Sequence, residues 1–155
     1  MSDFTTTVKW SRDNGDFLSN KYSRAHSWHF DGGVVVDASA SPHIVPLPWS
    51  VAENIDPEEA FVASLSSCHM LFFLSIAAEH KYQVESYVDN ASGSMATNSE
   101  NKMAITEITL RPVCQFSGTS EPTEEDIARL HRLAHKQCFI ANSVKTQVKI
   151  ELGAK

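Results

Sequence analysis

The fold of this chain depends on one stretch, Asp56-Pro57-Glu58-Glu59-Ala60-Phe61-Val62-Ala63-Ser64-Leu65-Ser66-Ser67-Cys68-His69-Met70. Asp56 is a good helix N-cap, and Pro57 suits the first helical position, where a backbone N–H would have no helical partner anyway. The apolar run continues to Ala78. The sequence therefore predicts a long helix that begins after Asp56 and carries Cys68 near its middle.

This predicted helix is apolar almost all round. Between Ala60 and Ala78, His69 is the only residue with an acidic or basic side chain, and the run approaches the length of a membrane span. Serines interrupt the run and charged residues flank it closely, which favours a helix buried in a soluble core. In a chain this small, a second subunit is the simplest source of full cover. We therefore expect a homodimer and no membrane partner.

Length, charge and cysteine count limit the class of protein. A chain of 155 residues with 42% apolar residues fits a single domain, residues 1–155, with a hydrophobic core. A net charge of −6 without a run of Lys or Arg argues against nucleic acid as a partner. The three cysteines are odd in number and widely spaced, and the first residues lack the basic start and apolar run of a signal peptide. These features predict a cytoplasmic protein with reduced thiols.

The remaining elements follow from alternation and turn signals. Alternating or β-branched runs predict strands, and the last of them is half-buried: Phe4–Trp10, Tyr22–Phe30, Val34–Ala40, Val84–Thr97, Met103–Phe116 and Val144–Leu152. Asp31-Gly32-Gly33 predicts a hairpin turn, and three prolines make residues 41–54 a loop. A second helix is expected after Thr123, with Asp126 completing a capping box. This order predicts an α+β fold with a largely antiparallel sheet packed on two long helices.

The other two cysteines are both expected to face the core. On the second helix, Cys138 follows Leu130 and Ala134 at helical spacing and ends the buried face. Cys114 shares the strand phase of Ile108, so it is interpreted as a small core hydrophobe. A thiol in the middle of the first helix and another at the end of the second suggest a redox pair.

Two motifs in this chain resemble those of the OsmC/Ohr family of thiol-dependent peroxidases. The first is Pro57-Glu58-Glu59 followed by Cys68, ten residues after the first glutamate. The second is a cysteine near the end of the second long helix, here Cys138-Phe139-Ile140-Ala141-Asn142-Ser143. The order of strands and helices also agrees, so the resemblance covers most of the chain. Phe139 replaces the usual proline, and His69 stands where the best-known members carry an aromatic or aliphatic residue.

The resemblance implies an intertwined homodimer and a two-cysteine peroxidase that reduces organic hydroperoxides to alcohols without a cofactor or metal. Cys68 would become a sulfenic acid, Cys138 would resolve it as a disulfide, and an external dithiol would reduce that disulfide. In the family, an arginine held by the helix-start glutamate supports the reactive thiolate. Glu58 fits the glutamate, Arg24 is our choice for the arginine, and Arg12 is the rival.

Physical chemistry agrees with an arginine in this role. Burial alone raises the pKa of a thiol, whereas a guanidinium stays charged when buried and can hold a thiolate. Ten helical residues span about 15 Å, so Glu58 cannot reach Cys68 on its own helix directly. A long arginine could bridge part of the gap, or an antiparallel second chain could bring its own Glu58 close. The apolar residues around the cysteine are candidate walls of a substrate pocket: Phe61, Leu65, Phe72 and Phe73.

Two alternatives remain open from the sequence. His131, His135 and Cys138 have the spacing His-x3-His-x2-Cys and could bind zinc, although three ligands from one straight helix would require its end to unwind. Alternatively, the fold could be a non-enzymatic module that binds a small molecule or lipid. The role of His69, beside Cys68 in sequence but about 100° around the helix, is not determined by the sequence.

Overall fold

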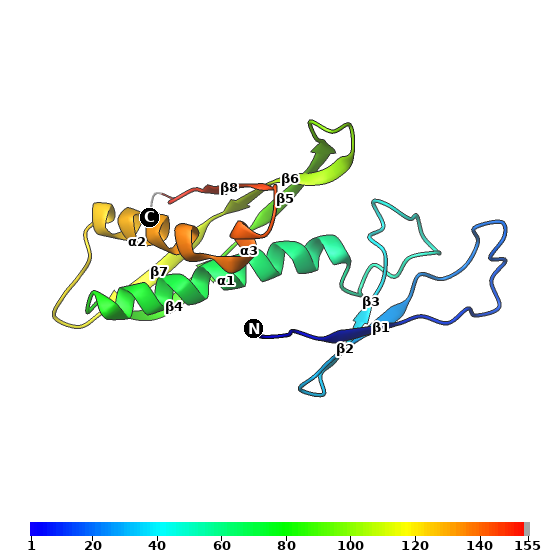
Figure 1. Ribbon diagram of the computed structural model, residues 1–155, viewed down its shortest axis with the longest axis horizontal. Coiled ribbons are helices and arrows are strands. Elements are labelled where there is room, and N and C mark those ends of the chain that lie inside the picture. Colours follow the sequence, from blue (N-terminus) through cyan, green and yellow to red (C-terminus); the bar gives the residue numbers. More distant parts are fainter. Residues whose placement is uncertain (154–155) are drawn as a thin grey trace. The chain divides into compact units, whose positions relative to one another are not determined.

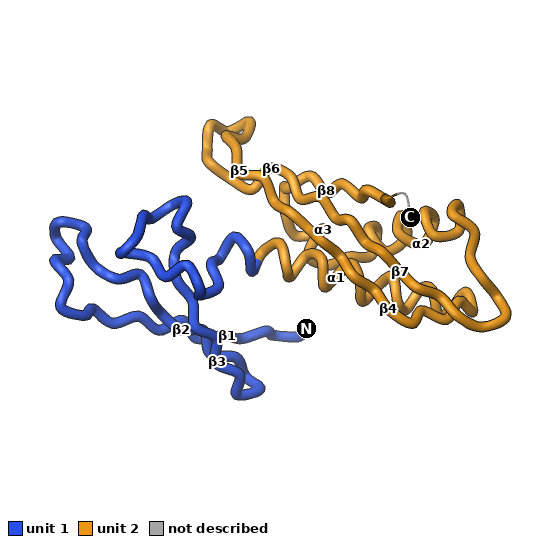
Figure 2. The backbone as a smooth tube through the Cα atoms, turned by 180° about the vertical axis from the view of Figure 1, so that it is seen from behind, with its two compact units in different colours: residues 1–60 blue, residues 61–155 orange. Residues whose placement is uncertain are grey.

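The computed structural model describes residues 1–153, and the chain divides into two compact units with the boundary between Ala60 and Phe61 (Figure 2). We call residues 1–60 unit 1 and the remainder unit 2. The boundary falls in the first turn of the long helix α1, Pro57–Glu79 (Figure 1). The expectation of one domain over the whole chain stays a prediction.

Unit 1 is built on a three-stranded antiparallel sheet. Its strands pair in the order β1-β2-β3 and run over β1 Thr6–Lys9, β2 His26–Phe30 and β3 Val35–Ala38. The predicted hairpin turn is confirmed: Gly33 has a φ of 87°, and its N–H donates to the Phe30 carbonyl. That φ lies in the left-handed region, where glycine has no Cβ penalty. All three strands are shorter than predicted, and the second begins only at His26.

Both ends of helix α1 are capped by hydrogen bonds. The Glu59 N–H donates to Asp56 Oδ1 at 2.7 Å, and the Asp56 N–H donates to Glu59 Oε2 at 3.3 Å, so the predicted N-cap is part of a capping box. At the other end, Lys81 adopts a φ of 65° and the Tyr82 N–H reaches back to the Ala77 carbonyl. This pattern is a Schellman-type helix end without glycine.

In unit 2, the two long predicted strands are each interrupted. The hairpin consists of β4 Gln83–Asp89, β5 Ser92–Thr97, β6 Met103–Leu110 and β7 Pro112–Ser117. The outer part pairs β4 with β7, and the inner part pairs β5 with β6. At the break, the Arg111 N–H donates to the Asp89 carboxylate at 2.6 Å, and Pro112 has no N–H to offer. The last strand, β8 Gln147–Ile150, runs parallel to β6.

The second helix ends where the sequence predicts. Helix α2 spans Glu124–Gln137, and Thr123 and Asp126 form the expected capping box. Cys138 is both the C-cap of α2 and the N-cap of a short helix, α3 Phe139–Asn142. The fold is therefore the predicted α+β arrangement, with mostly antiparallel strands and two long helices.

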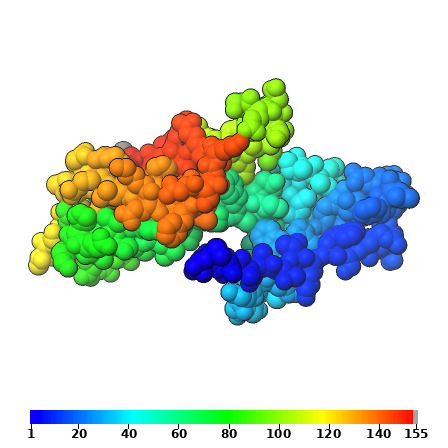
Figure 3. Space-filling model, viewed as in Figure 1, coloured from blue at the N-terminus to red at the C-terminus, as the bar shows by residue number. Residues whose placement is uncertain are grey.

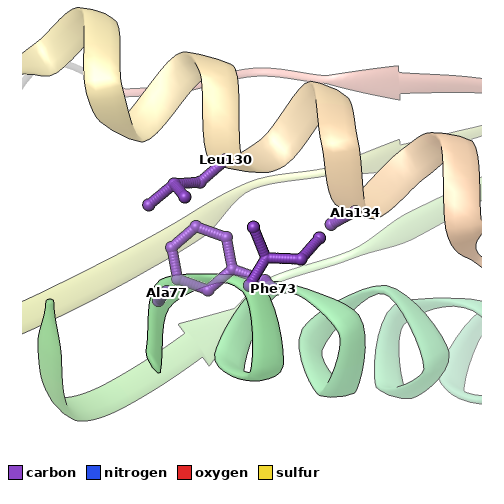
Figure 4. Packing of buried hydrophobic residues seen from close by; sticks show 5 residues of the cluster. Phe73, Ala77, Leu130 and Ala134 are labelled. Atoms are coloured by element: carbon purple, nitrogen blue, oxygen red, sulfur yellow. The ribbon is translucent and has the colours of Figure 1, made fainter. Parts of the chain in front are cut away.

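Two core clusters lie along α1. In the first, Phe73 and Ala77 of α1 pack against Leu130 and Ala134 of α2 (Figure 4). The space-filling view shows α2, in orange, lying alongside the green carboxyl-terminal half of α1 (Figure 3). In the second cluster, Leu65 packs against two apolar residues of β6 and partly buried residues of β8. One stretch of α1 is thus buried against α2 and another against the sheet, which is only part of the burial that its apolar composition predicts.

One chain does not cover α1 completely. By length and composition, α1 could cross a membrane, a test that the core helix of a soluble protein also passes. Only 28% of its most apolar window is buried, and the side chain of Leu71 is 60% exposed. This uncovered apolar surface is consistent with the expectation of a second subunit, which stays a prediction.

Gly93 of β5 sets how closely the sheet approaches α1. A Cβ at this position would lie 2.7 Å from Val62 Cγ2 and 3.3 Å from Ile105 Cγ2. We expect Gly93→Ala to lower the free energy of unfolding by about 1–3 kcal/mol, because overpacking forces side chains or backbone to shift. Urea denaturation at fixed protein concentration measures this loss. Gly32→Ala is the control, because a Cβ there meets nothing within 4 Å. Equal midpoints for the two variants would contradict this packing.

Candidate functional site

The structure brings Cys68 and Cys138 together. Cys68 lies on α1 and is partly buried, whereas Cys138 is fully buried at the junction of α2 and α3. Cys68 is near enough to raise the pKa of the Cys138 thiol, and neither cysteine forms a disulfide. Seventy residues apart in sequence, they meet because α2 packs along α1 and ends beside the middle of that helix.

The surroundings of Cys138 favour the neutral thiol. Burial is the main cause that raises its pKa, and the neighbouring Cys68 raises it further. The Ala141 N–H acts in the opposite direction, since it donates to Cys138 Sγ at 3.4 Å. A buried thiol of this kind is a poor nucleophile but can condense with an oxidised neighbour.

Cys114, the third cysteine, has no such neighbour. Its side chain packs against the first core cluster, and burial raises the pKa of its thiol to about 11. This agrees with its interpretation as a small core hydrophobe.

Glu58 lies in the first turn of α1, ten residues before Cys68, which is about 15 Å along the axis. The capping box uses Glu59, so the carboxylate of Glu58 is not needed to cap the helix. Among residues 1–153, no cation forms a salt bridge with Glu58. The structure therefore leaves this carboxylate available, and its role beside a cysteine stays a prediction.

Arg24 lies in unit 1, but not on a strand as predicted. It precedes β2, and its guanidinium turns back to donate to the carbonyls of Asn20 and Tyr22 and to Asn20 Oδ1. These bonds compete with an extended strand at this point. The rival Arg12 donates one bond of 3.2 Å to the Gly15 carbonyl in an exposed turn. Each unit is described by itself, so the pairing of either arginine with Cys68 stays a prediction.

Two of the four candidate pocket residues on α1 prove to be core. Leu65 and Phe73 are fully buried, each in one of the two core clusters, so they cannot line an open pocket. Phe61 and Phe72 are partly exposed and pack at the edges of the clusters. The sequence did not reveal this difference, because the period of a helix alone does not show which of its faces are covered.

A buried histidine pair is the feature that sequence reasoning missed. His69 and His131 are both 1% exposed, and His69 Nε2 lies 2.9 Å from His131 Nδ1. The His131 ring also stacks on Phe73 at 4.2 Å. His131 therefore faces α1 rather than a zinc site. Within residues 1–153, no three His, Cys, Asp or Glu side chains form a group that could hold a metal ion.

Burial keeps this pair neutral. It lowers the pKa of His69 to about 4, with the charge of His135 acting in the same direction and that of Asp89 opposing it. Burial, followed by the charge of His69, lowers the pKa of His131 to about 3. The outer nitrogens, His69 Nδ1 and His131 Nε2, have no hydrogen-bond partner in the described residues. Since one nitrogen of each neutral ring carries a proton, one outer nitrogen is a donor and the other an acceptor.

We expect the histidine pair to make the fold sensitive to acid. Both pKa values lie below the unfolded value of about 6.5, so the unfolded chain binds protons more readily. The contribution of the neutral pair to the free energy of unfolding is fully present above a pH of about 6.5. It falls as the pH drops towards 4, by up to about 1.4 kcal/mol per pH unit for each histidine. Chemical denaturation at a series of pH values measures this slope.

The double substitution His69→Leu with His131→Leu should flatten the slope, because it removes both titrating groups together. The matched control is His43→Leu, at an exposed position of unit 1. If the double variant kept the wild-type slope, the pair would not be the source of acid sensitivity.

Comparisons with known proteins identify relatives of this chain in sequence and in fold. The protein-family profile for OsmC-like proteins matches residues 51–153. An OsmC-like protein of unknown function from Vibrio cholerae is 57% identical, with a TM-score of 0.95 over 97% of this chain and 99% of that one. A search of curated proteins finds no match.

More distant solved structures share the fold. An organic hydroperoxide resistance protein from Elizabethkingia anophelis is 15% identical, with a TM-score of 0.70 over 98% of this chain and 94% of that one. The OhrB protein of Bacillus subtilis, also named for organic hydroperoxide resistance, is 21% identical, with a TM-score of 0.64 over 97% and 98% of the two chains.

Proposed function

The chain belongs to the OsmC-like family, and on this basis we propose that it is a two-cysteine peroxidase that reduces organic hydroperoxides. The observation that carries the proposal is the juxtaposition of the free thiols of Cys68 and Cys138. The names of the distant relatives, which share the fold, point to the same substrate class. A cytoplasmic location, where cellular reductants keep thiols reduced, suits this chemistry.

The proposed cycle has three steps. The Cys68 thiolate attacks one peroxide oxygen, an S–O bond forms as the O–O bond breaks, and the leaving alkoxide takes a proton to become an alcohol. The sulfur of Cys138 then displaces hydroxide from the sulfenic acid, giving a disulfide and water. An external dithiol returns two electrons by thiol–disulfide exchange.

The roles of the two cysteines follow from their environments. Cys138 is fully buried and its pKa is raised, which suits the resolving thiol better than the attacking one. Cys68 is the more accessible of the two cysteines, which suits the thiol that attacks the peroxide first. In the proposal, a guanidinium holds the Cys68 thiolate, with Arg24 preferred over Arg12 because Arg24 is fixed by three hydrogen bonds.

Substitution of single cysteines tests the cycle. We expect Cys68→Ser to abolish hydroperoxide consumption, because the attacking thiolate is gone. Cys138→Ser should consume one equivalent and then stop at the sulfenic acid, which mass spectrometry detects. Cys114→Ser is the control and should retain full turnover, since Cys114 packs in the core away from the pair. Full activity in Cys68→Ser would refute the peroxidase proposal and favour a binding module of the same fold.

We further propose a homodimer in which Glu58 of one chain serves Cys68 of the other. This arrangement is supported by the distance of about 15 Å within one helix and by the exposed apolar surface of α1. An antiparallel partner would shorten the distance and cover the helix at once. The glutamate would orient the arginine, so its loss should slow the reaction without removing the thiols.

Mixed dimers distinguish a composite site, built from residues of both chains, from a site built within one chain. We combine one chain carrying Glu58→Ala with one carrying Cys68→Ser, and purify the mixed dimer with two affinity tags. A composite site predicts about half of wild-type turnover, because one of the two sites receives both intact residues. A dimer of wild-type chain with the doubly substituted chain is the control and should turn over at about half the slow rate of a dimer in which both chains carry Glu58→Ala. The opposite pattern would place Glu58 and Cys68 of one chain in the same site.

A further inference from the structure

Unit 1 contains an open groove of about 470 Å³, and its lining includes Arg24, the arginine preferred above for the Cys68 thiolate. Three aromatic side chains and one cation line it: Trp10, Phe17, Tyr22 and Arg24. All the lining residues belong to residues 1–60, so the groove is complete within one unit. Its volume lies in the range of small-molecule sites, roughly 300–1,000 Å³.

The aromatic walls hold one another in place. The rings of Phe17 and Tyr22 stack at 4.6 Å, and Trp10 meets Tyr22 edge-on at 5.5 Å. The Trp10 indole N–H donates to the Ser23 carbonyl at 2.9 Å, which fixes that ring as well. Even so, Trp10 is 41% and Phe17 47% exposed. A preformed set of rings with exposed surface is suited to covering a flat apolar ligand.

Arg24 gives this groove a charge preference. Both Nη1 protons are donated to the carbonyls of Asn20 and Tyr22, and Nη2 donates one proton to Asn20 Oδ1 at 2.6 Å. The guanidinium also lies over the Tyr22 ring, 3.7 Å from its centre. This leaves the Nε proton and one Nη2 proton unused. Among the described residues, no carboxylate forms a salt bridge with Arg24.

We propose that this groove binds an aromatic carboxylate. The flat ring would lie against Trp10 and Phe17, and the carboxylate would accept the two unused protons of Arg24. A fixed guanidinium matches a carboxylate in shape as well as charge, and the aromatic wall adds contacts that a small inorganic anion cannot make. The inference goes beyond the peroxidase proposal, because its ligand is not a peroxide. Since Arg24 is also the arginine preferred there for the Cys68 thiolate, the carboxylate and the thiolate would compete for it.

Titration calorimetry of the full chain with 2-naphthoate tests the proposal. We expect saturable binding of one molecule per chain, with quenching of Trp10 fluorescence that Trp10→Phe removes. The neutral analogue 2-naphthamide should bind about tenfold more weakly or worse, because it loses charge-assisted hydrogen bonds. Octanoate distinguishes the two parts of the ligand: it keeps the carboxylate but lacks the ring, and it should also bind more weakly.

Substitution of arginine locates the carboxylate. Arg24→Gln should weaken 2-naphthoate binding by about tenfold or more while leaving 2-naphthamide binding nearly unchanged. Arg12→Gln is the matched control, since Arg12 belongs to the same unit but does not line the groove. The comparison of acid with amide uses wild-type protein, so it remains decisive if Arg24→Gln fails to fold. Repeating the titration with Cys68→Ser separates ligand binding from peroxidase activity.

Three results would overturn the proposal. The first is the absence of saturable 2-naphthoate binding to the wild-type protein. The second is equal affinity for acid and amide, which would leave no role for the guanidinium. The third is binding to monomers but not to dimers in sedimentation experiments, which would show that a second copy of the chain fills the groove.

Discussion

The need to cover one long apolar helix shapes unit 2. Helix α1 presents apolar side chains in nearly every direction, so no single packing surface suffices for it. The chain covers one stretch with α2, through Phe73 and Ala77 against Leu130 and Ala134. It covers another with the sheet, through Leu65 against Ile108 and Leu110. These contacts determine where α2 lies and where it ends. The position of Cys138 relative to Cys68 depends on them.

The thiol pair is a consequence of this packing. Cys68 lies between Leu65 and Phe73 in sequence, and therefore between the two core clusters. Cys138 follows Ala134 by one turn and lies where α2 gives way to α3. A change in the register of α2 against α1 would separate the sulfurs, although both cysteines would remain on their helices. The same burial that aligns them raises the pKa of Cys138 and so favours its neutral thiol.

The histidine pair shows that this core is not optimised for stability alone. Two imidazoles meet between α1 and α2, yet the outer nitrogen of each lacks a partner among the described residues. The Tyr87 hydroxyl is likewise buried without a partner, and burial, with Asp89 and Cys114 adding to it, raises its pKa. Unsatisfied buried polar atoms cost free energy that apolar residues would not. Directional bonds of this kind fix one alignment of two helices, which plain apolar packing specifies less strictly.

The sequence by itself determined the local structure. Asp56 and Pro57 start α1, Thr123 and Asp126 cap α2, and Gly33 turns the first hairpin, because each effect involves residues within one or two turns. The family followed from the spacing of Glu58 and Cys68 and from Cys138. Only the tertiary structure decided that His131 faces His69 and that Leu65 and Phe73 are core. It also decided that the two long strands break, one after Asp89 and the other at Arg111. These outcomes depend on contacts between segments far apart in the chain, and periodicity along one segment does not encode its partner.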